Sequence, residues 1–245
     1  MSGSNEALLS FFLNRLTRRS RLSQEEQDAI LALPSHAERI AAHADIIHPG
    51  ERTDHATLVG KGIIARFDQM ASGKRQITSL YYRGDVCDLH SVACPIAGWG
   101  LEAMTPSLVL KIAHSDLREL AVRYPAIAMA FWRDTTVDGS IIAKWAANLG
   151  RQPALPRLAH LFCEAGVRLE DAGCGHRQQY DLGLTQEQLA DVAGLTAVHV
   201  NRTLQELRGE GLIESSGQTR IPDWERLCSI AEFDPTYLLR FKQPL

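Results

Sequence analysis

The stretch LTQEQLADVAGLTAVHVNRTLQELRGEGLIESSGQTRI, residues 184–221, decides the interpretation of this chain. Thr185 is followed three residues later by Gln188, the pattern of a capping box that begins a helix. Gly194 marks a tight turn, because glycine adopts the left-handed backbone that ends many helices. Thr196 then caps a second helix. The pattern predicts two helices joined by a short turn.

The second helix of this pair has an apolar face and a polar face. Val200, Leu204 and Leu207 follow the helical period, and we expect them to face a core. The side chains on the outer face include one guanidinium and two amides, as the major groove of DNA requires. The residues expected to contact DNA are Thr185, Gln186, Thr196, Ala197, Val198, His199, Asn201, Arg202 and Gln205.

These expected contacts have distinct chemistry. Arg202 can pair bidentately with guanine, and Asn201 with adenine. The two threonines lie at helix N-termini, where free N–H groups and the helix dipole favour phosphate. The hairpin after the second helix, with Gly217 in its turn, is expected to form a wing. An ordinary helical pair in a core could explain any one feature, but it explains the ordered set poorly.

The N-terminal half has a different pattern. From residue 46 to residue 112, short β-prone runs are punctuated by glycine, which predicts an antiparallel roll or barrel. Gly73 is expected in a hairpin turn. Residues 6–19 and 23–33 have helical patterns, and the second opens with a capping box of Ser23 and Glu26.

A helical pattern follows the predicted roll, with large apolar residues at steps of four. They are Ile127, Phe131, Ile141, Trp145 and Leu149. This stripe could lie on the roll, or it could pair with the same helix of a second subunit. The residue spacing and the position of the helix between two domains favour pairing. Asp138 and Gly139 are weak helix formers within this pattern, so a kink or break of the helix there is an alternative. Gly150 is expected to end the helix before a hinge.

Composition and charge agree with a globular chain of two domains. Of 245 residues, 45% are hydrophobic and 22% charged. Residues 1–150 carry 16 Lys and Arg against 16 Asp and Glu, and residues 151–245 carry 10 against 13. The C-terminal part is therefore not basic overall, so DNA binding would depend on local geometry and dimerisation. With no signal-peptide pattern and no apolar run that spans a bilayer, we expect a cytoplasmic protein without a membrane partner.

The cysteines and catalytic motifs give little sign of a cofactor or an enzyme. Five widely spaced cysteines, at positions 87, 94, 163, 174 and 228, argue against a disulfide framework. Without a C-x-x-C pair, a zinc or iron–sulfur site would need ligands from distant segments. No nucleophile elbow, phosphate-binding glycine loop or zinc-hydrolase signature occurs. We therefore expect no enzyme activity and no metal site, and the sequence identifies no cofactor.

Nearly the whole chain resembles the Crp/Fnr superfamily of bacterial transcription regulators. The resemblance rests on IIHPGE (46–51), VGKGIIARF (59–67), SGKRQITSLYYRGDV (72–86), EAMTPSLVLKIAHSDLREL (102–120) and residues 184–213. It implies an α+β chain with a cyclic-nucleotide-binding-like β-roll and N-terminal helices (1–120), a long dimerisation helix (121–150), a winged helix-turn-helix (151–225) and a C-terminal extension (226–245).

The resemblance also implies how such a protein works. It implies a homodimer through residues 124–149, effector binding coupled to reorientation of the DNA-binding domains, and RNA polymerase as a partner if the protein activates. The family's recognition helix often begins with an Arg-Glu pair, but this chain has Ala197 and Val198 there and keeps only the later arginine, Arg202. Its operator is therefore expected to differ from that of the cyclic-AMP activator.

The sensor cassette departs further from the family pattern. A cyclic-nucleotide site needs a cation for the phosphate, yet no Lys or Arg occurs from residue 84 to residue 107. Unpaired phosphate would be costly there, so cyclic AMP is not the expected effector. The expected effector-binding residues are Arg83, Asp85, Cys87, Asp88 and His90.

The cysteines and histidines bear on which sensing chemistry the protein could use. Residues 1–86 contain no cysteine, which argues against the family's N-terminal iron–sulfur cluster. Haem is an open alternative, because histidines that could ligate its iron lie in or near the predicted roll, namely His43, His48, His55 and His90. Cys87, His90 and Cys94 leave a redox or metal role open, although buried thiols are the favoured interpretation. A ligand-sensing or redox-sensing module without DNA function is the rival hypothesis, and it does not account for an outward Asn201–Arg202 pair.

Overall fold

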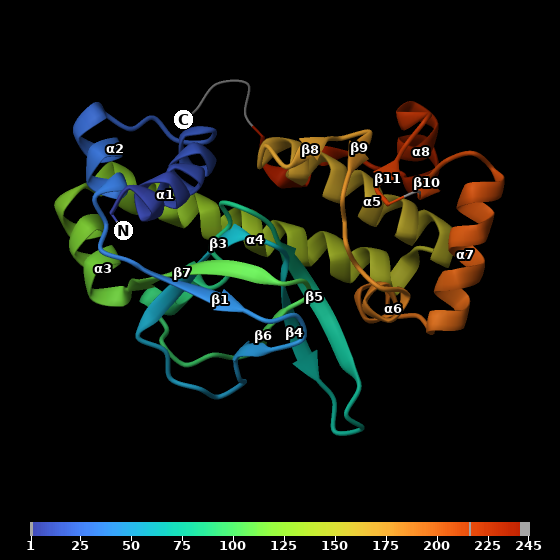
Figure 1. Cartoon of the computed structure of the whole chain (residues 1–245), viewed down its shortest axis with the longest axis horizontal. Helices are drawn as coiled ribbons and strands as arrows, with labels where there is room; N and C mark the ends of the chain where they lie inside the picture. Colours follow the sequence, from blue (N-terminus) through green and yellow to red (C-terminus); the bar gives the residue numbers. More distant parts are fainter. Residues whose placement is uncertain (1, 216, 241–245) are drawn as a thin grey trace.

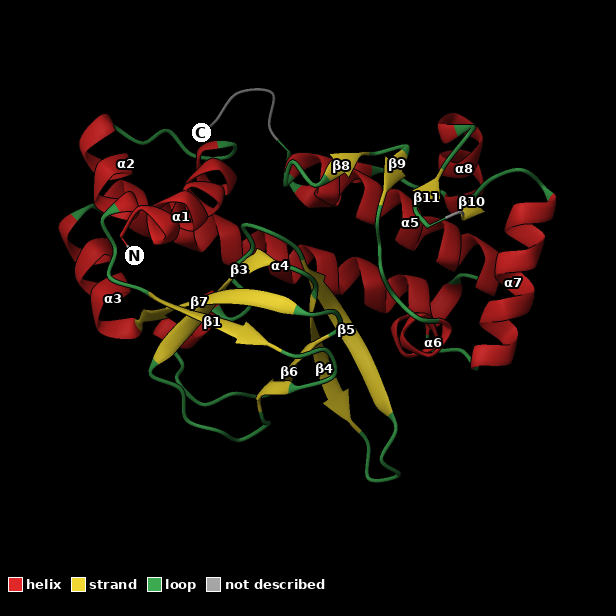
Figure 2. Cartoon of the chain, in the orientation of Figure 1, coloured by secondary structure: helices red, strands yellow, loops and turns green. Residues whose placement is uncertain are grey.

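The computed structural model describes residues 2–215 and 217–240. A helical and β-roll half is joined by one long helix to a smaller C-terminal domain, as Figure 1 and Figure 2 show. This arrangement confirms the predicted α+β architecture with a C-terminal helix-turn-helix. Within the described residues, no helix has the length and apolar character needed to cross a membrane.

Two N-terminal helices, α1 (Ser2–Thr17) and α2 (Gln24–Leu31), precede the roll. Helix α2 begins with the predicted capping box. The hydroxyl of Ser23 accepts the N–H of Glu26 at 3.3 Å, and the Glu26 carboxylate accepts the N–H of Ser23 at 2.7 Å. These bonds satisfy two N–H groups that the helix leaves free, so the predicted start is confirmed.

The roll consists of two antiparallel sheets. One has the order β1 (His36–Ile40), β7 (Ser107–Ala113) and β3 (His55–Lys61). The other has the order β2 (Asp45–Ile47), β6 (Gly100–Ala103), β4 (Ile64–Gln69) and β5 (Arg75–Tyr81). Gly73 has a φ of +83° in the β4–β5 turn, as predicted. A short 3-10 helix, η1 (Leu89–Val92), follows β5.

The long helix α4 (Pro125–Arg151) follows α3 (His114–Arg123) and is unbroken at Gly139. It ends one residue beyond Gly150. Four residues of the predicted pairing stripe, Ile127, Phe131, Ile141 and Trp145, are buried within the chain, and Leu149 is half-buried. Phe131 stacks on Phe12 of α1 with ring centroids 5.9 Å apart, and Trp145 packs into the core shared with the C-terminal domain. The prediction that this stripe contacts a second subunit is therefore wrong, because its own domains cover it.

The opposite face of α4 is exposed and has a regular spacing. Its residues alternate at steps of three and four, the heptad pattern of a helix-pairing seam. Trp132 is 68% exposed and Met129 is 44% exposed. We call this face the outer seam; its residues are Met129, Trp132, Thr136, Gly139, Ala143, Ala146 and Gly150.

The C-terminal domain begins with α5 (Ala154–Asp171). The helix pair consists of α6 (Gln186–Ala193) and α7 (Ala197–Gly209). A small antiparallel sheet has the order β10 (Glu214–Ser215), β11 (Thr219–Arg220), β9 (Gln179–Tyr180) and β8 (Gly175–His176). Helix α8 (Trp224–Ala231) and the 3-10 helix η2 (Pro235–Leu238) complete the domain. Leu227, Ala231 and Leu238 are buried in the same core as α5 and α7.

Helix α6 lies against the roll, and side-chain amides join the two. The amide of Gln188 donates to the carbonyl of Met104 at 2.8 Å, in a buried position. The amide of Gln76 on β5 donates to the carbonyl of Asp191 at 2.9 Å. The helix pair is therefore hydrogen-bonded to the roll as well as connected to it through α4.

Candidate nucleic-acid interface and sensor site

Helix α6 starts with the predicted capping box. The hydroxyl of Thr185 accepts the N–H of Gln188 at 3.2 Å, and the Gln188 side chain accepts the N–H of Thr185 at 2.8 Å. Gly194 ends the helix with a φ of +62°, a conformation that glycine adopts without strain. The hydroxyl of Thr196 then accepts the N–H of His199 at 3.2 Å and begins α7. The local sequence thus dictates both helix starts and the turn between them.

Helix α7 has one buried face and one exposed face. Val200, Leu204 and Leu207 are buried, as predicted. On the other side Val198 is 82% exposed, and Arg202 and Gln205 are exposed. We call these last three residues the recognition face. The Arg202 side chain has no hydrogen bond or ion pair with any described residue, so its guanidinium can contact a partner.

Three predicted contact residues are less exposed than expected. Ala197 is half-buried and packs against the core, because it falls on the same helical face as Val200 and Leu204. Asn201 is half-buried, and its amide donates to the side-chain oxygen of Gln186 at 3.0 Å. His199 is also half-buried. The fully outward set is therefore smaller than the sequence indicated.

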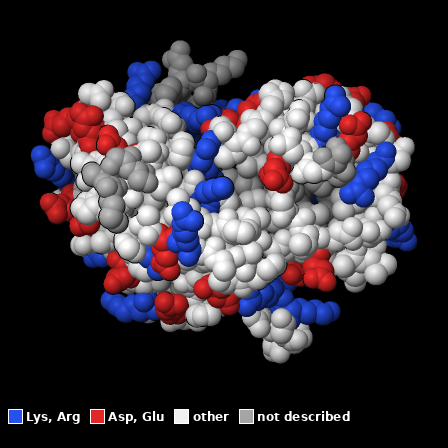
Figure 3. Space-filling model, in the orientation of Figure 1, with Lys and Arg blue, Asp and Glu red and all other residues white. Residues whose placement is uncertain are grey.

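The hairpin after α7 is formed by β10 and β11, with Gly217 at a φ of +82°. Strand β11 also pairs with β9, so the hairpin continues a four-stranded sheet. In Figure 3, basic and acidic side chains are interspersed over the C-terminal half of the face shown, without a broad basic surface.

A small cavity lies where the roll meets α4, with a volume of about 190 Å³. Arg66 of β4 extends into it and pairs with Asp138 of α4 at 3.1 Å, and its guanidinium lies 4.7 Å from the Trp99 ring centre. His90 packs against the same ring, and burial lowers the pKa of His90 to about 4. The cavity thus holds a cation that is already neutralised, beside an uncharged imidazole.

The five expected effector-binding residues do not form one site. Only His90 lines this roll cavity. Cys87 is buried among the roll strands, where burial raises its pKa well above the usual value. Asp88 is buried against the N–H of Thr57. Arg83 and Asp85 face a second, separate cavity. No cluster of three or more metal-ligating side chains occurs within residues 2–215 and 217–240.

Arg66 and Asp138 are the cavity residues that the sequence analysis missed. They come from β4 and α4, outside the contiguous segment of residues 83–90 that contains the expected effector-binding residues. One signal was available. Arg66 interrupts an apolar run, IIARF, and a charged residue in a buried strand needs a partner.

Asp85 belongs to a buried charge network of Arg15, Asp85, Asp134, Glu164 and Arg168. Its carboxylate accepts from Arg15 at 2.5 Å and from Arg168 at 2.8 Å. Arg15 also pairs with Asp134 at 2.6 Å, and Arg168 with Glu164 at 3.0 Å. Burial opposes ionisation, but the two guanidiniums outweigh it and hold the pKa of Asp85 below its usual value. The network joins α1, α4, α5 and the loop after β5.

Comparison with known proteins agrees with both halves of the structure. The cyclic nucleotide-binding domain family matches residues 37–124, and the Crp-like helix-turn-helix domain family matches residues 156–230. Together with the fold, these matches define a transcription regulator in which a sensor-type β-roll is joined to a helix-turn-helix. The chain belongs to the Crp/Fnr superfamily of bacterial transcription regulators, and the similar proteins are named as regulators rather than enzymes.

Three relatives illustrate the similarity. The transcriptional activator protein FnrL of Cereibacter sphaeroides is 26% identical over 196 residues, which is 77% of each chain. The probable transcriptional regulator flp of Lacticaseibacillus casei is 27% identical over 235 residues, covering 94% of this chain and all of the relative. The structure of FixK2 from Bradyrhizobium japonicum superposes with a TM-score of 0.74 at 24% identity, covering 81% of this chain and 98% of the other.

The first prediction concerns the pH dependence of folding stability. Burial raises the pKa of Asp88 to about 6. An acid whose pKa rises on folding binds its proton more tightly in the folded state, so its stabilising contribution is complete below about pH 4 and is lost as the pH rises through 6. Asp88→Asn should therefore be more stable than the wild type at pH 8, by up to about 3 kcal/mol, and nearly equal at pH 4.

Urea unfolding at the two pH values measures this difference. Asp68→Asn, at an exposed position on β4, is the matched control and should show no such pH-dependent gain. A stability difference for Asp88→Asn that is the same at both pH values would contradict the assignment of a buried titrating carboxyl.

The second prediction is that cyclic AMP binds weakly. The roll cavity is below the roughly 300 Å³ at which drug-sized ligand pockets begin, and its one cation is paired with Asp138. We expect calorimetry to give a Kd above about 100 µM, equivalent to roughly −5.5 kcal/mol. A submicromolar Kd for the wild type would overturn this prediction.

Proposed function

We propose that the protein is a homodimer that binds a two-fold symmetric DNA operator, with one α7 helix in the major groove of each half-site. The observation that carries this proposal is the recognition face, an exposed cationic and amide-bearing surface on a capped helix behind a glycine turn. A helix presented in this way can insert its N-terminal half into the groove.

The recognition face supplies specificity, and the helix N-termini supply position. Arg202 can pair bidentately with guanine, and the exposed Val198 methyl groups suit contact with a thymine methyl. Thr185 and Thr196 lie where N–H groups favour phosphate. Asn201 is already bonded to Gln186, so a contact with adenine requires that it exchange this partner. We therefore assign the main sequence-reading role to Arg202.

The outer seam of α4 supports the dimer. Its heptad spacing matches the geometry of paired helices, and it exposes a tryptophan and a methionine that a second copy would cover. Pairing on a two-fold axis would set the two α7 helices to read half-sites one or more helical turns apart, roughly 34 Å per turn. The dimer surface thus differs from the stripe that the sequence indicated.

The signal that controls DNA binding is an effector other than cyclic AMP, in keeping with the small, neutralised roll cavity. If the regulator activates transcription, RNA polymerase is a further partner. We also propose a cytoplasmic location, because that is where bacterial DNA lies.

The third prediction tests the outer seam. Trp132→Glu places a charge at its most exposed apolar side chain and should convert the dimer to a monomer at micromolar concentration. Light scattering after gel filtration measures this. Met70→Glu is the matched control, an exposed methionine on the roll far from α4 in sequence, and should leave the mass unchanged. A Trp132→Glu protein that remains fully dimeric would mean that another surface forms the dimer.

The fourth prediction separates base recognition from phosphate contact. Arg202→Ala should cost about 1–3 kcal/mol per half-site and relax the preference at one base pair, because a bidentate guanine contact carries sequence information. Thr196→Ala should weaken binding to all sequences alike and cost about 1 kcal/mol of helix stability through the lost cap. Selection from randomised operators measures both. Retention of the full wild-type base preference by Arg202→Ala would place another face in the groove.

A further inference from the structure

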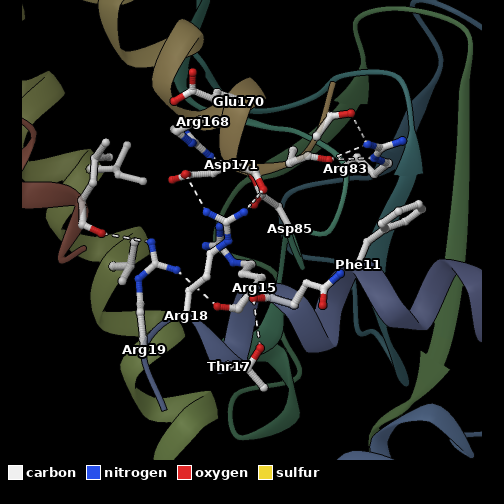
Figure 4. Close-up of a pocket in the computed structure, with 16 residues that line it drawn as sticks. Phe11, Arg15, Thr17, Arg18, Arg19, Arg83, Asp85, Arg168, Glu170 and Asp171 are labelled. Carbon is white, nitrogen blue, oxygen red and sulfur yellow. Dashed lines mark hydrogen bonds and ion pairs between the residues drawn. The ribbon is translucent and has the colours of Figure 1, made fainter. Parts of the chain in front are cut away.

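A second cavity, of about 550 Å³, lies between α1, α4, α5 and the loop after β5. It is separate from the roll cavity and from the recognition face, and no part of the DNA-binding function uses it. Its volume is within the range of pockets that hold small-molecule ligands. We call it the arginine cleft, because its lining includes Arg15, Arg18, Arg19, Arg83 and Arg168. Figure 4 shows Arg15, Arg18 and Arg168 near the centre of the view, with Arg19 on one side of them and Arg83 on the other.

The charges around the arginine cleft are not balanced one to one. Three acidic residues line it, namely Asp85, Glu170 and Asp171. Arg15 and Arg168 share Asp85 and use Asp134 and Glu164 behind it.

The carboxylates of the two other acidic residues, Asp171 and Glu170, also form ion pairs. Asp171 pairs with Arg18 at 2.6 Å and with Arg240 at 2.9 Å, and Glu170 pairs with Arg177. Two guanidiniums, those of Arg19 and Arg83, are therefore left without a carboxylate partner within the described residues.

Arg19 is the more deeply buried of these two arginines and the stronger indication of an anion site. It is only 8% exposed, and its guanidinium donates to the backbone carbonyls of Leu238 at 3.0 Å and Arg15 at 3.5 Å. Its Nε is buried without a hydrogen-bond partner in residues 2–215 and 217–240. Burial and the neighbouring Arg15 lower the pKa of Arg19 to about 10. A buried cation with an orphaned donor is costly unless an anion compensates it.

Arg83 forms the opposite wall. Its guanidinium donates to the carbonyls of Ala172 at 2.6 Å and Gly173 at 2.5 Å, and it lies over the ring of Phe11, 4.2 Å from the ring centre. The ring and the carbonyls hold the guanidinium in place without neutralising its charge. In Figure 4, Arg19 and Arg83 lie on opposite sides of the central cluster. On the molecular surface, basic side chains run down the middle of the face shown in Figure 3.

We propose that the arginine cleft binds a small organic polyanion, a metabolite with phosphate or carboxylate groups, between Arg19 and Arg83. Guanidinium groups bind both kinds of anion through paired, charge-assisted hydrogen bonds. An anion there would compensate the two guanidiniums that line the cleft without a carboxylate partner among the described residues. It would contact the segment after α1 and the loop after β5 at the same time, and Arg83 of that loop is itself bonded to the segment that follows α5.

Calorimetric titration of the full-length protein tests this proposal with two probes, pyrophosphate for the phosphate source and citrate for the carboxylate source. Sodium chloride at equal ionic strength is the salt control. We expect at least one probe to bind the wild type with one site per chain. Arg19→Gln and Arg83→Gln should each weaken that binding tenfold or more. Arg39→Gln, an exposed arginine on β1, is the matched control and should bind as the wild type does.

Two further measurements keep the outcomes distinct. Arg19→Gln removes an uncompensated buried charge, so its melting temperature without probe should equal or exceed that of the wild type, which separates lost binding from lost folding. Arg202→Ala should retain probe binding even where it loses the operator. The proposal fails if neither probe binds at millimolar concentration, if Arg19→Gln binds within twofold of the wild type, or if binding is lost in Arg202→Ala instead.

Discussion

The position of Asp85 between two arginines is the interaction on which the arrangement of this molecule depends. One carboxylate, buried in the loop after β5, receives Arg15 from α1 and Arg168 from α5. Two guanidiniums in the interior are tolerated only because carboxylates surround them, and removal of one partner of such a set costs roughly 3–5 kcal/mol. Because each member comes from a different element, the relative positions of α1, the roll and α5 are determined together.

The same network continues to the C-terminal end of the described chain. Glu164 accepts hydrogen bonds from the indole of Trp145 at 2.9 Å and from the hydroxyl of Tyr237 at 2.6 Å, as well as from Arg168. The central helix, the first helix of the C-terminal domain and η2 therefore meet at one carboxylate. The orientation of the DNA-binding domain is set by buried polar contacts with the sensor half rather than by the short link between α4 and α5.

Features that depend on local sequence were predictable, and features that depend on which surfaces meet were not. The capping boxes at Ser23 and Thr185 follow from residues three apart, and both occur as predicted. The apolar stripe through Phe131 was identified, but its partner was not, since burial against α1 and burial against a second subunit give the same periodicity. The small residues that make up most of the outer seam give no hydrophobic signal at all.

The effector residues show the same limit more strongly. Contiguous sequence grouped Asp85 with His90, yet the fold separates them into two cavities, and the charged partners of each come from distant segments. The outer seam carries a mechanical consequence for the proposed dimer. Its bulky residues, Met129 and Trp132, lie at the sensor end, and its small ones, from Gly139 to Gly150, lie towards the DNA-binding domain. Paired helices approach as closely as their contact side chains allow. The two helix axes would therefore converge towards the operator, in a pair that is narrower at the DNA-binding end than at the sensor end.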